Sequence, residues 1–136
     1  MTKPAAATRS LVVEREMPHP PEKIWRALTQ PHLIEEWLMK NDFKPVVGHS
    51  FNLRADWGVV DCQVLAVKPN KTLSYTWGAY GLESVVTWTL TPTSTGTHLR
   101  MEQSGFRPDQ QQYYEGAKGG WQRFVGGLER VAAGLD

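Results

Sequence analysis

The last part of the chain carries an apolar stripe that fits one long amphipathic helix. Its members are separated by three and four residues in turn, which keeps them on one helical face; they are Tyr114, Ala117, Trp121, Phe124, Leu128, Val131 and Leu135. Glycine lowers helix stability by up to about 1 kcal/mol relative to alanine, yet the same segment contains Gly116, Gly119, Gly120, Gly126, Gly127 and Gly134. The sequence therefore predicts a long closing helix. Its glycines, which have no side chain, either let another element pack closely against the helix or leave volume for a ligand.

Two shorter helices are expected near the start of the chain. Residues 10–17 alternate apolar and polar side chains and predict a first strand. Residues 19–28 and 29–39 then place apolar side chains at helical spacing, and both segments have proline close to their start. Proline is tolerated in a first helical turn because the N–H group that it lacks would have no partner there.

The middle of the chain has the two-residue period of strands that bury one face. Strands are expected over 50–56, 59–67, 72–77, 84–90 and 97–104, with turns at 56–58, 69–71 and 91–96 and a loop over 78–83. Short connections make consecutive strands antiparallel neighbours. Together with the first strand, the pattern predicts one curved antiparallel sheet of about six strands, and hence an α+β fold.

Composition limits the class of protein. With 136 residues, of which 40% are hydrophobic and 21% charged, the chain fits one globular domain over 9–136 after a disordered lead-in over 1–8. The formal net charge of +1 provides no basic surface for nucleic acid. No segment approaches the roughly 20 apolar residues of a membrane span, and the first residues lack the apolar core of a signal peptide. A single cysteine, Cys62, suits a reducing compartment, so a cytoplasmic location is expected.

The order of these elements resembles the helix-grip fold of the SRPBCC superfamily, which includes START and birch-pollen-allergen-like proteins. More narrowly, the chain is similar to the bacterial stand-alone branch of the activator of heat-shock-protein-90 ATPase homologue family. The stretches that carry this resemblance are PPEKIWRALTQPHLIEEWL (20–38), GHSFNLR (48–54), VLAVKPNKTLSYTW (64–77), VTWTLTPTSTGTHLRMEQSGF (86–106) and GGWQRFVGGLERV (119–131). The resemblance implies a sheet that grips the long helix, with a space for ligands between the two.

No motif for metal binding or nucleophilic catalysis is found. The four histidines are scattered without ligand spacing, so no metal site is expected, and no cofactor is implied. Cys62 lies in the middle of a strand, where a free cysteine usually behaves as a small apolar side chain. Asp42 is one of the polar residues weighed for acid–base work; Glu36 and Glu83, weighed with it, are expected on the surface, and no catalytic residue is assigned.

The candidate site is the inner wall of the space beneath the long helix. Its predicted ligand-binding residues all lie on apolar faces of the surrounding elements: Trp37, Phe51, Leu53, Tyr75, Trp77, Trp88, Met101, Gln103, Trp121 and Phe124. Some of them would be ordinary core. Tyr75, Gln103 and Arg54 are the polar groups that would orient a ligand, although Gln103 could equally bond the neighbouring backbone. Met39 and Phe43 are candidates for a lid or entrance.

The favoured function is the binding of a small hydrophobic or aromatic molecule. One alternative is an interaction protein that modulates a chaperone ATPase through its outer surface. A second is a cyclase or hydrolase acting on a hydrophobic substrate, which would need an inward-facing titratable group. The expected partners are a small hydrophobic molecule and, in the first alternative, a chaperone, and the expected assembly is a monomer or a homodimer.

Overall fold

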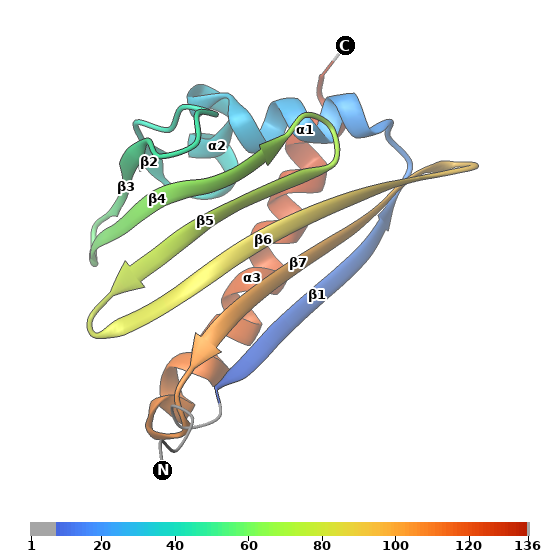
Figure 1. Ribbon diagram of the computed structural model, residues 1–136. Coiled ribbons are helices and arrows are strands. Elements are labelled where there is room, and N and C mark those ends of the chain that lie inside the picture. Colours follow the sequence, from blue (N-terminus) through green and yellow to red (C-terminus); the bar gives the residue numbers. More distant parts are fainter. Residues whose placement is uncertain (1–7, 136) are drawn as a thin grey trace.

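A curved antiparallel sheet wraps around the long C-terminal helix in the computed structural model, which describes residues 8–135 (Figure 1). The elements along the chain are β1 (Arg9–Met17), α1 (Pro21–Thr29), α2 (Pro31–Trp37), β2 (Lys40–Asn41), β3 (Ser50–Ala55), β4 (Gly58–Lys68), β5 (Thr72–Ala79), β6 (Leu82–Thr93), β7 (Gly96–Phe106), the short 3₁₀ helix η1 (Pro108–Gln110) and α3 (Gln111–Ala133). This arrangement confirms the predicted α+β helix-grip fold. Of the predicted lead-in, residues 1–7 lie outside the described residues.

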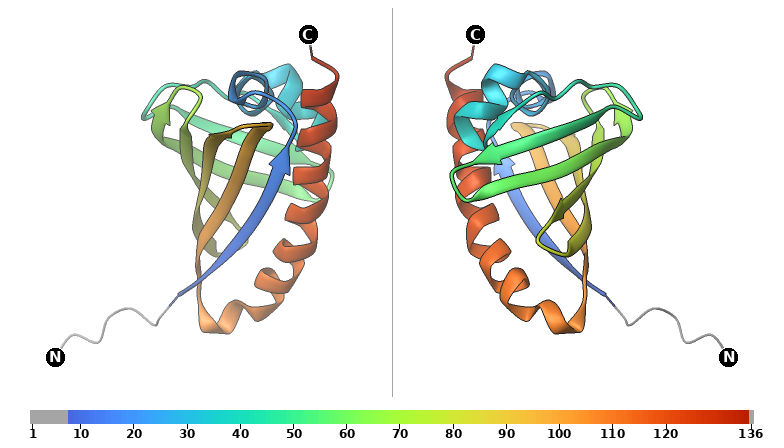
Figure 2. Two further views of the ribbon diagram at one scale, coloured as in Figure 1. Left: turned by 90° about the vertical axis from the view of Figure 1, so that its right-hand side faces the viewer. Right: turned by 90° about the vertical axis from the view of Figure 1, so that its left-hand side faces the viewer.

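The strands form one seven-stranded sheet in the order β1-β7-β6-β5-β4-β3-β2. Strands β2 to β7 follow the chain, whereas β1 joins the far edge beside β7, where Val13 pairs with Met101. Figure 2 shows the sheet curled so that α3 runs along its inner side, with α1 and α2 at the end where α3 finishes. The core therefore lies between the inner face of the sheet and the three helices.

The alternation predicted for the strands places the core residues. In β6 the buried side chains include Ser84, Val86, Trp88 and Leu90, and the residues between them are more exposed. Neighbouring strands are in matching register, so inward residues form rows across the sheet. One such row runs from Tyr75 on β5 through Val86 to Gln103 on β7.

The connection between β5 and β6 is shorter than the sequence predicts. The expected loop over 78–83 is instead a tight hairpin, because both strands continue to within two residues of each other. The two turn residues, Tyr80 and Gly81, have φ of 52° and 83°. Positive φ at both central positions is what a two-residue type I′ turn requires. Gly81 adopts its positive φ without strain and so supports the hairpin turn.

The segment after α2 contains a short strand that the sequence did not predict. Lys40 and Asn41 form β2 and pair with Arg54 and Leu53 at the edge of the sheet. On either side of β2, Met39 and Phe43 are 7% and 3% exposed. This segment, considered as a lid or entrance, therefore forms part of the wall of the interior.

The buried face of α3 turns gradually away from the predicted stripe. Trp121 and Leu128 are buried as expected, but Val125 and Ala132 replace Phe124 and Val131, which are only half-buried. A strict alternation of three and four residues averages about 3.5 per turn, whereas an α-helix has about 3.6, so the predicted stripe drifts around the helix. Leu135 lies beyond the helix end.

Polar contacts fix the helices in place. Arg15, which interrupts the apolar face of β1, reaches α3, where its Nε lies 2.6 Å from a carboxylate oxygen of Glu129. The Trp37 indole N–H of α2 donates to the Ala27 carbonyl of α1 at 2.8 Å. Among residues 8–135, no helix combines the length and the apolar character needed to cross a membrane.

Candidate functional site

All ten residues predicted to bind a ligand face the interior between the sheet and the helices. Nine of them are buried, and Phe124 is half-buried at the margin. They come from α2, β3, β5, β6, β7 and α3, so five elements other than α3 converge on one region. Arg54, in contrast, is exposed at the sheet edge, so the structure does not bring it to this region. Glu36 and Glu83 are exposed, as the sequence predicts, and Asp42 is exposed as well.

Trp121 lies at the centre of an aromatic cluster. Its ring centroid is 5.1 Å from that of Trp77, 5.7 Å from that of Trp88 and 5.5 Å from that of Phe124. Trp37 meets Trp88 edge to face at 5.6 Å. All four separations lie in the favoured range for aromatic pairs, and the pairs other than Trp77–Trp121 are edge to face, an arrangement worth about 0.5–1.5 kcal/mol beyond the area that it buries.

A second aromatic group extends the interior toward β3. Phe51 contacts Phe43 at 5.0 Å and Tyr75 at 5.4 Å between ring centroids, both nearly perpendicular. The Trp88 indole N–H donates to the Tyr75 hydroxyl oxygen at 3.0 Å and so joins the two groups. The interior is therefore one continuous ring-lined region.

A chain of buried hydrogen bonds crosses this region. The Trp121 indole N–H donates to Oε1 of Gln103 at 2.7 Å, Nε2 of Gln103 donates to Oγ of Ser84 at 2.9 Å, and Ser84 donates to the Trp77 carbonyl at 2.9 Å. An indole N–H can only donate, so it fixes which end of the Gln103 amide carries the oxygen. Gln103 was predicted to point inward, and it does.

Ser84 is a partner that the sequence analysis missed. It shares the inward alternation of Val86 and Trp88 and is 6% exposed. That alternation was the available signal, but a small hydroxyl at the start of a predicted strand does not by itself indicate a buried role. Its function here is to connect the Gln103 amide to the backbone.

The glycines of α3 fall into two groups. A Cβ at Gly127 would lie 3.3 Å from Cβ of Trp37, so this glycine lets α2 approach closely. A Cβ at Gly116 would meet nothing within 4 Å, and at half-buried Gly120 it would meet only the Phe124 ring, at 4.0 Å. Close approach therefore explains Gly127, whereas Gly116 faces solvent and Gly120 has no neighbour closer than the Phe124 ring.

Three aromatic residues join the elements at the end where α3 begins. The Tyr80 hydroxyl in the β5–β6 turn donates to the Trp57 carbonyl in the β3–β4 turn, and the Tyr113 hydroxyl of α3 donates to the Tyr80 carbonyl at 2.8 Å. Their side chains remain 41–64% exposed. These contacts hold the two hairpins and the helix together at this end of the molecule.

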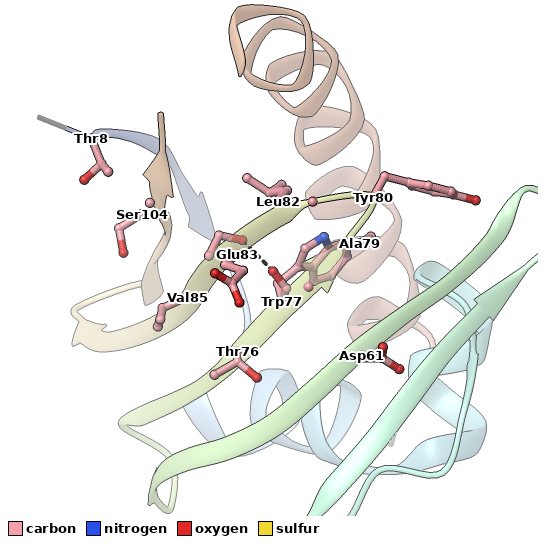
Figure 3. Close-up of a pocket in the computed structure, with 14 residues that line it drawn as sticks. Thr8, Asp61, Thr76, Trp77, Ala79, Tyr80, Leu82, Glu83, Val85 and Ser104 are labelled. Atoms are coloured by element: carbon pink, nitrogen blue, oxygen red, sulfur yellow. Dashed lines mark hydrogen bonds between the residues drawn. The ribbon is translucent and has the colours of Figure 1, made fainter. Parts of the chain in front are cut away.

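A hollow of about 940 Å³ opens beside the β5–β6 hairpin (Figure 3). Asp61, Thr76, Glu83 and Val85 line it, and each alternates with buried neighbours in its strand. The side chains of these four residues point away from α3, but the lining also includes the buried residues Trp77 and Ser84, so the hollow adjoins the ring-lined interior. Trp77 is the one lining residue that was predicted to bind a ligand; the outward positions were not predicted, because such positions of a sheet usually face solvent.

The ionisable groups of the interior are held in their neutral forms. Burial raises the pKa of the Cys62 thiol to about 12, helped by the nearby carboxylates of Asp61 and Asp42. Burial also raises the pKa of the Tyr75 hydroxyl well above its usual range, against the opposing effect of the hydrogen bond from Trp88. Both groups therefore stay protonated near neutral pH.

Cys62 is accordingly expected to resist alkylation in the folded protein. The thiolate is the reactive form, and a rise in pKa to about 12 lowers its population roughly 1000-fold near neutral pH. Labelling with a maleimide, followed by mass spectrometry, should be slow in buffer and fast in denaturant. Equal rates in the two conditions would contradict the buried placement.

Residues 18–133 match the protein family described as activator of Hsp90 ATPase homolog 1-like protein. The chain belongs to this family. The match confirms the family indicated by the sequence stretches, and the helix-grip architecture agrees with its place in the SRPBCC superfamily. A comparison with curated protein sequences found no match.

Solved structures share the fold over nearly the whole chain. Protein MLL2253 from Mesorhizobium loti is 68% identical, with a TM-score of 0.91 over 94% of this chain and 99% of that one. Protein BH1534 from Bacillus halodurans is 27% identical, with a TM-score of 0.82 over 91% and 96%. DynU16, from the dynemicin biosynthetic locus, is 26% identical with a TM-score of 0.83; the match covers 92% of this chain but 47% of DynU16, about half its length.

Proposed function

We propose that this protein binds a small apolar or aromatic molecule between the sheet and α3. The observation that carries the proposal is that half-buried Gly120, where a Cβ would meet only the Phe124 ring at 4.0 Å, adjoins the ring cluster of Trp121 and Phe124. A ligand entering there would meet aromatic rings on the sheet side and the bare Gly120 position of α3 on the other.

Removal of apolar surface from water supplies the binding energy. It yields about 25 cal/mol per Å² of buried apolar area, before the entropy costs of association. The aromatic walls add edge-to-face contacts to a flat ligand. Because these forces depend on area more than on chemistry, the site favours a class of ligands over one compound.

Binding is favoured over acid–base catalysis by the groups around the interior. The buried polar residues among the described ones are Thr29, Ser74, Ser84, Thr97, Gln103 and Gln110. A carboxylate or imidazole with a shifted pKa, which general acid–base catalysis of the cyclase or hydrolase kind needs, is not among them. The unpaired Cys62 thiol fits a reducing cytoplasm as the place of action.

Native mass spectrometry of the protein purified from its own host tests this proposal. We expect a population heavier than the chain by the mass of a small organic molecule, which is lost on denaturation. A library of apolar bicyclic compounds should also shift the mass of protein stripped of any ligand. A bare chain that binds none of these compounds would contradict the proposal, and a chaperone ATPase assay would then test the alternative role.

A further inference from the structure

Tyr75 carries a buried hydrogen-bond donor without a protein acceptor. Its hydroxyl oxygen accepts from the Trp88 indole at 3.0 Å. The hydroxyl proton itself donates to no group among the described residues, although the side chain is only 4% exposed. A buried donor that remains unpaired costs about 1–3 kcal/mol, so a partner for this proton would be stabilising.

Gln103 offers a second donor of the same kind. Its oxygen accepts from Trp121, and one N–H of its amide donates to Ser84. The other N–H has no acceptor among the described residues, and the side chain is 1% exposed. Trp121 fixes the amide orientation, so the unused group is a proton and not a lone pair.

The two donors belong to one inward row of the sheet. Tyr75 pairs with Val86 on β6, and Val86 pairs with Gln103 on β7. Adjacent strands lie about 4.8 Å apart, so the two backbones are separated by about 10 Å with an apolar side chain between them. A molecule lying across Val86 would have a donor at each side.

The interior also lacks groups that would hold a charge. Within residues 8–135, the buried polar side chains are hydroxyls and amides, and no lysine, arginine, aspartate or glutamate is buried. An ion placed there would lose its hydration without gaining a counter-charge. These observations favour a neutral ligand.

We propose that the ligand is a neutral, mainly apolar molecule whose carbonyl or ether oxygen accepts a hydrogen bond from Tyr75 or Gln103. This inference rests on the proposed function, since it concerns the same site. The proposal predicts that the site prefers ligands with a hydrogen-bond acceptor, such as ketones, quinones and lactones, over ligands of similar size that carry only a donor.

Three bicyclic probes of similar size test the inference. Indane has no polar group, indanone has a carbonyl acceptor, and indole has an N–H donor. We expect indanone to bind about tenfold more tightly than indole, which corresponds to one net hydrogen bond. Dissociation constants come from titrations followed by NMR, where the indole N–H signals of Trp88 and Trp121 report on Tyr75 and Gln103.

The probes separate the two proposals. If indane binds but indole binds as tightly as indanone, the acceptor preference is wrong and apolar binding stands. If none of the three binds, both proposals fail. If indanone is preferred, both are supported.

Two variants locate the preference. Trp88→Phe removes the indole but keeps the Tyr75 hydroxyl. The double variant Tyr75→Phe with Trp88→Phe removes both groups, so neither remains as a buried polar group without its partner. We expect the double variant to bind indanone about tenfold more weakly than Trp88→Phe does, with indane affinity equal in the two. Equal indanone affinity would exclude Tyr75 as the donor. Circular dichroism checks that the variants fold. If a variant does not fold, the comparison of the three probes with the natural protein still tests the proposal.

Discussion

Replacing Trp121 with alanine is expected to lower the free energy of unfolding by about 3–5 kcal/mol. The change removes the ring at the centre of three aromatic contacts. It also removes the indole N–H that donates to Gln103, and so leaves the buried side-chain oxygen of Gln103 without a partner. Urea denaturation followed by far-ultraviolet circular dichroism measures the loss.

The matched control is Trp57→Ala. Trp57 is 54% exposed, and surface substitutions usually change stability by less than about 0.5 kcal/mol. In the proposed site, Trp121→Ala should also change the affinity for indane, whereas Trp57→Ala should leave it unaltered. Equal stability of the two variants, or an unchanged indane affinity in Trp121→Ala, would count against the role assigned to Trp121.

Valine in place of Gly127 should destabilise the protein by about 1–3 kcal/mol, because it overfills a close contact. A Cβ at this position already lies 3.3 Å from Cβ and 3.6 Å from Cα of Trp37, and valine adds two methyl groups. Trp37 cannot retreat freely, since its indole is bonded to the Ala27 carbonyl. Thermal unfolding monitored by calorimetry gives the difference.

Gly116→Val is the control, with the same chemical change on the same helix. Nothing lies within 4 Å of a Cβ there, and the small gain in helix propensity over glycine keeps the expected change within about 0.5 kcal/mol. Gly116→Ala should stabilise by up to about 1 kcal/mol for the same reason. If both valine variants lost equal stability, close packing would not distinguish the two positions.

Local pattern predicted most of the fold, because alternation and helical spacing report directly on burial. Gln103 shows how far this reaches: parity alone placed its amide inward, where the structure has it. The pattern could not name its partners, since Trp121 and Ser84 come from other elements and depend on register across the sheet.

The errors have the same origin. Residues 78–83 were predicted as a loop, whereas strand pairing extends past Gly78 and the turn needs only Tyr80 and Gly81. Strand β2 was missed because two residues are too short for a periodic signal. Arg54 was expected near the ligand, but its position opposite Lys40 at the edge leaves it exposed.

Intermolecular nuclear Overhauser effects from bound indanone show where an apolar molecule binds. If it binds between α3 and the sheet, we expect contacts from the probe to the rings of Trp88, Trp121 and Phe124. Contacts confined to the methyl groups of Thr76 and Val85, which line the hollow beside the hairpin from the outer face of the sheet, would contradict binding at that place.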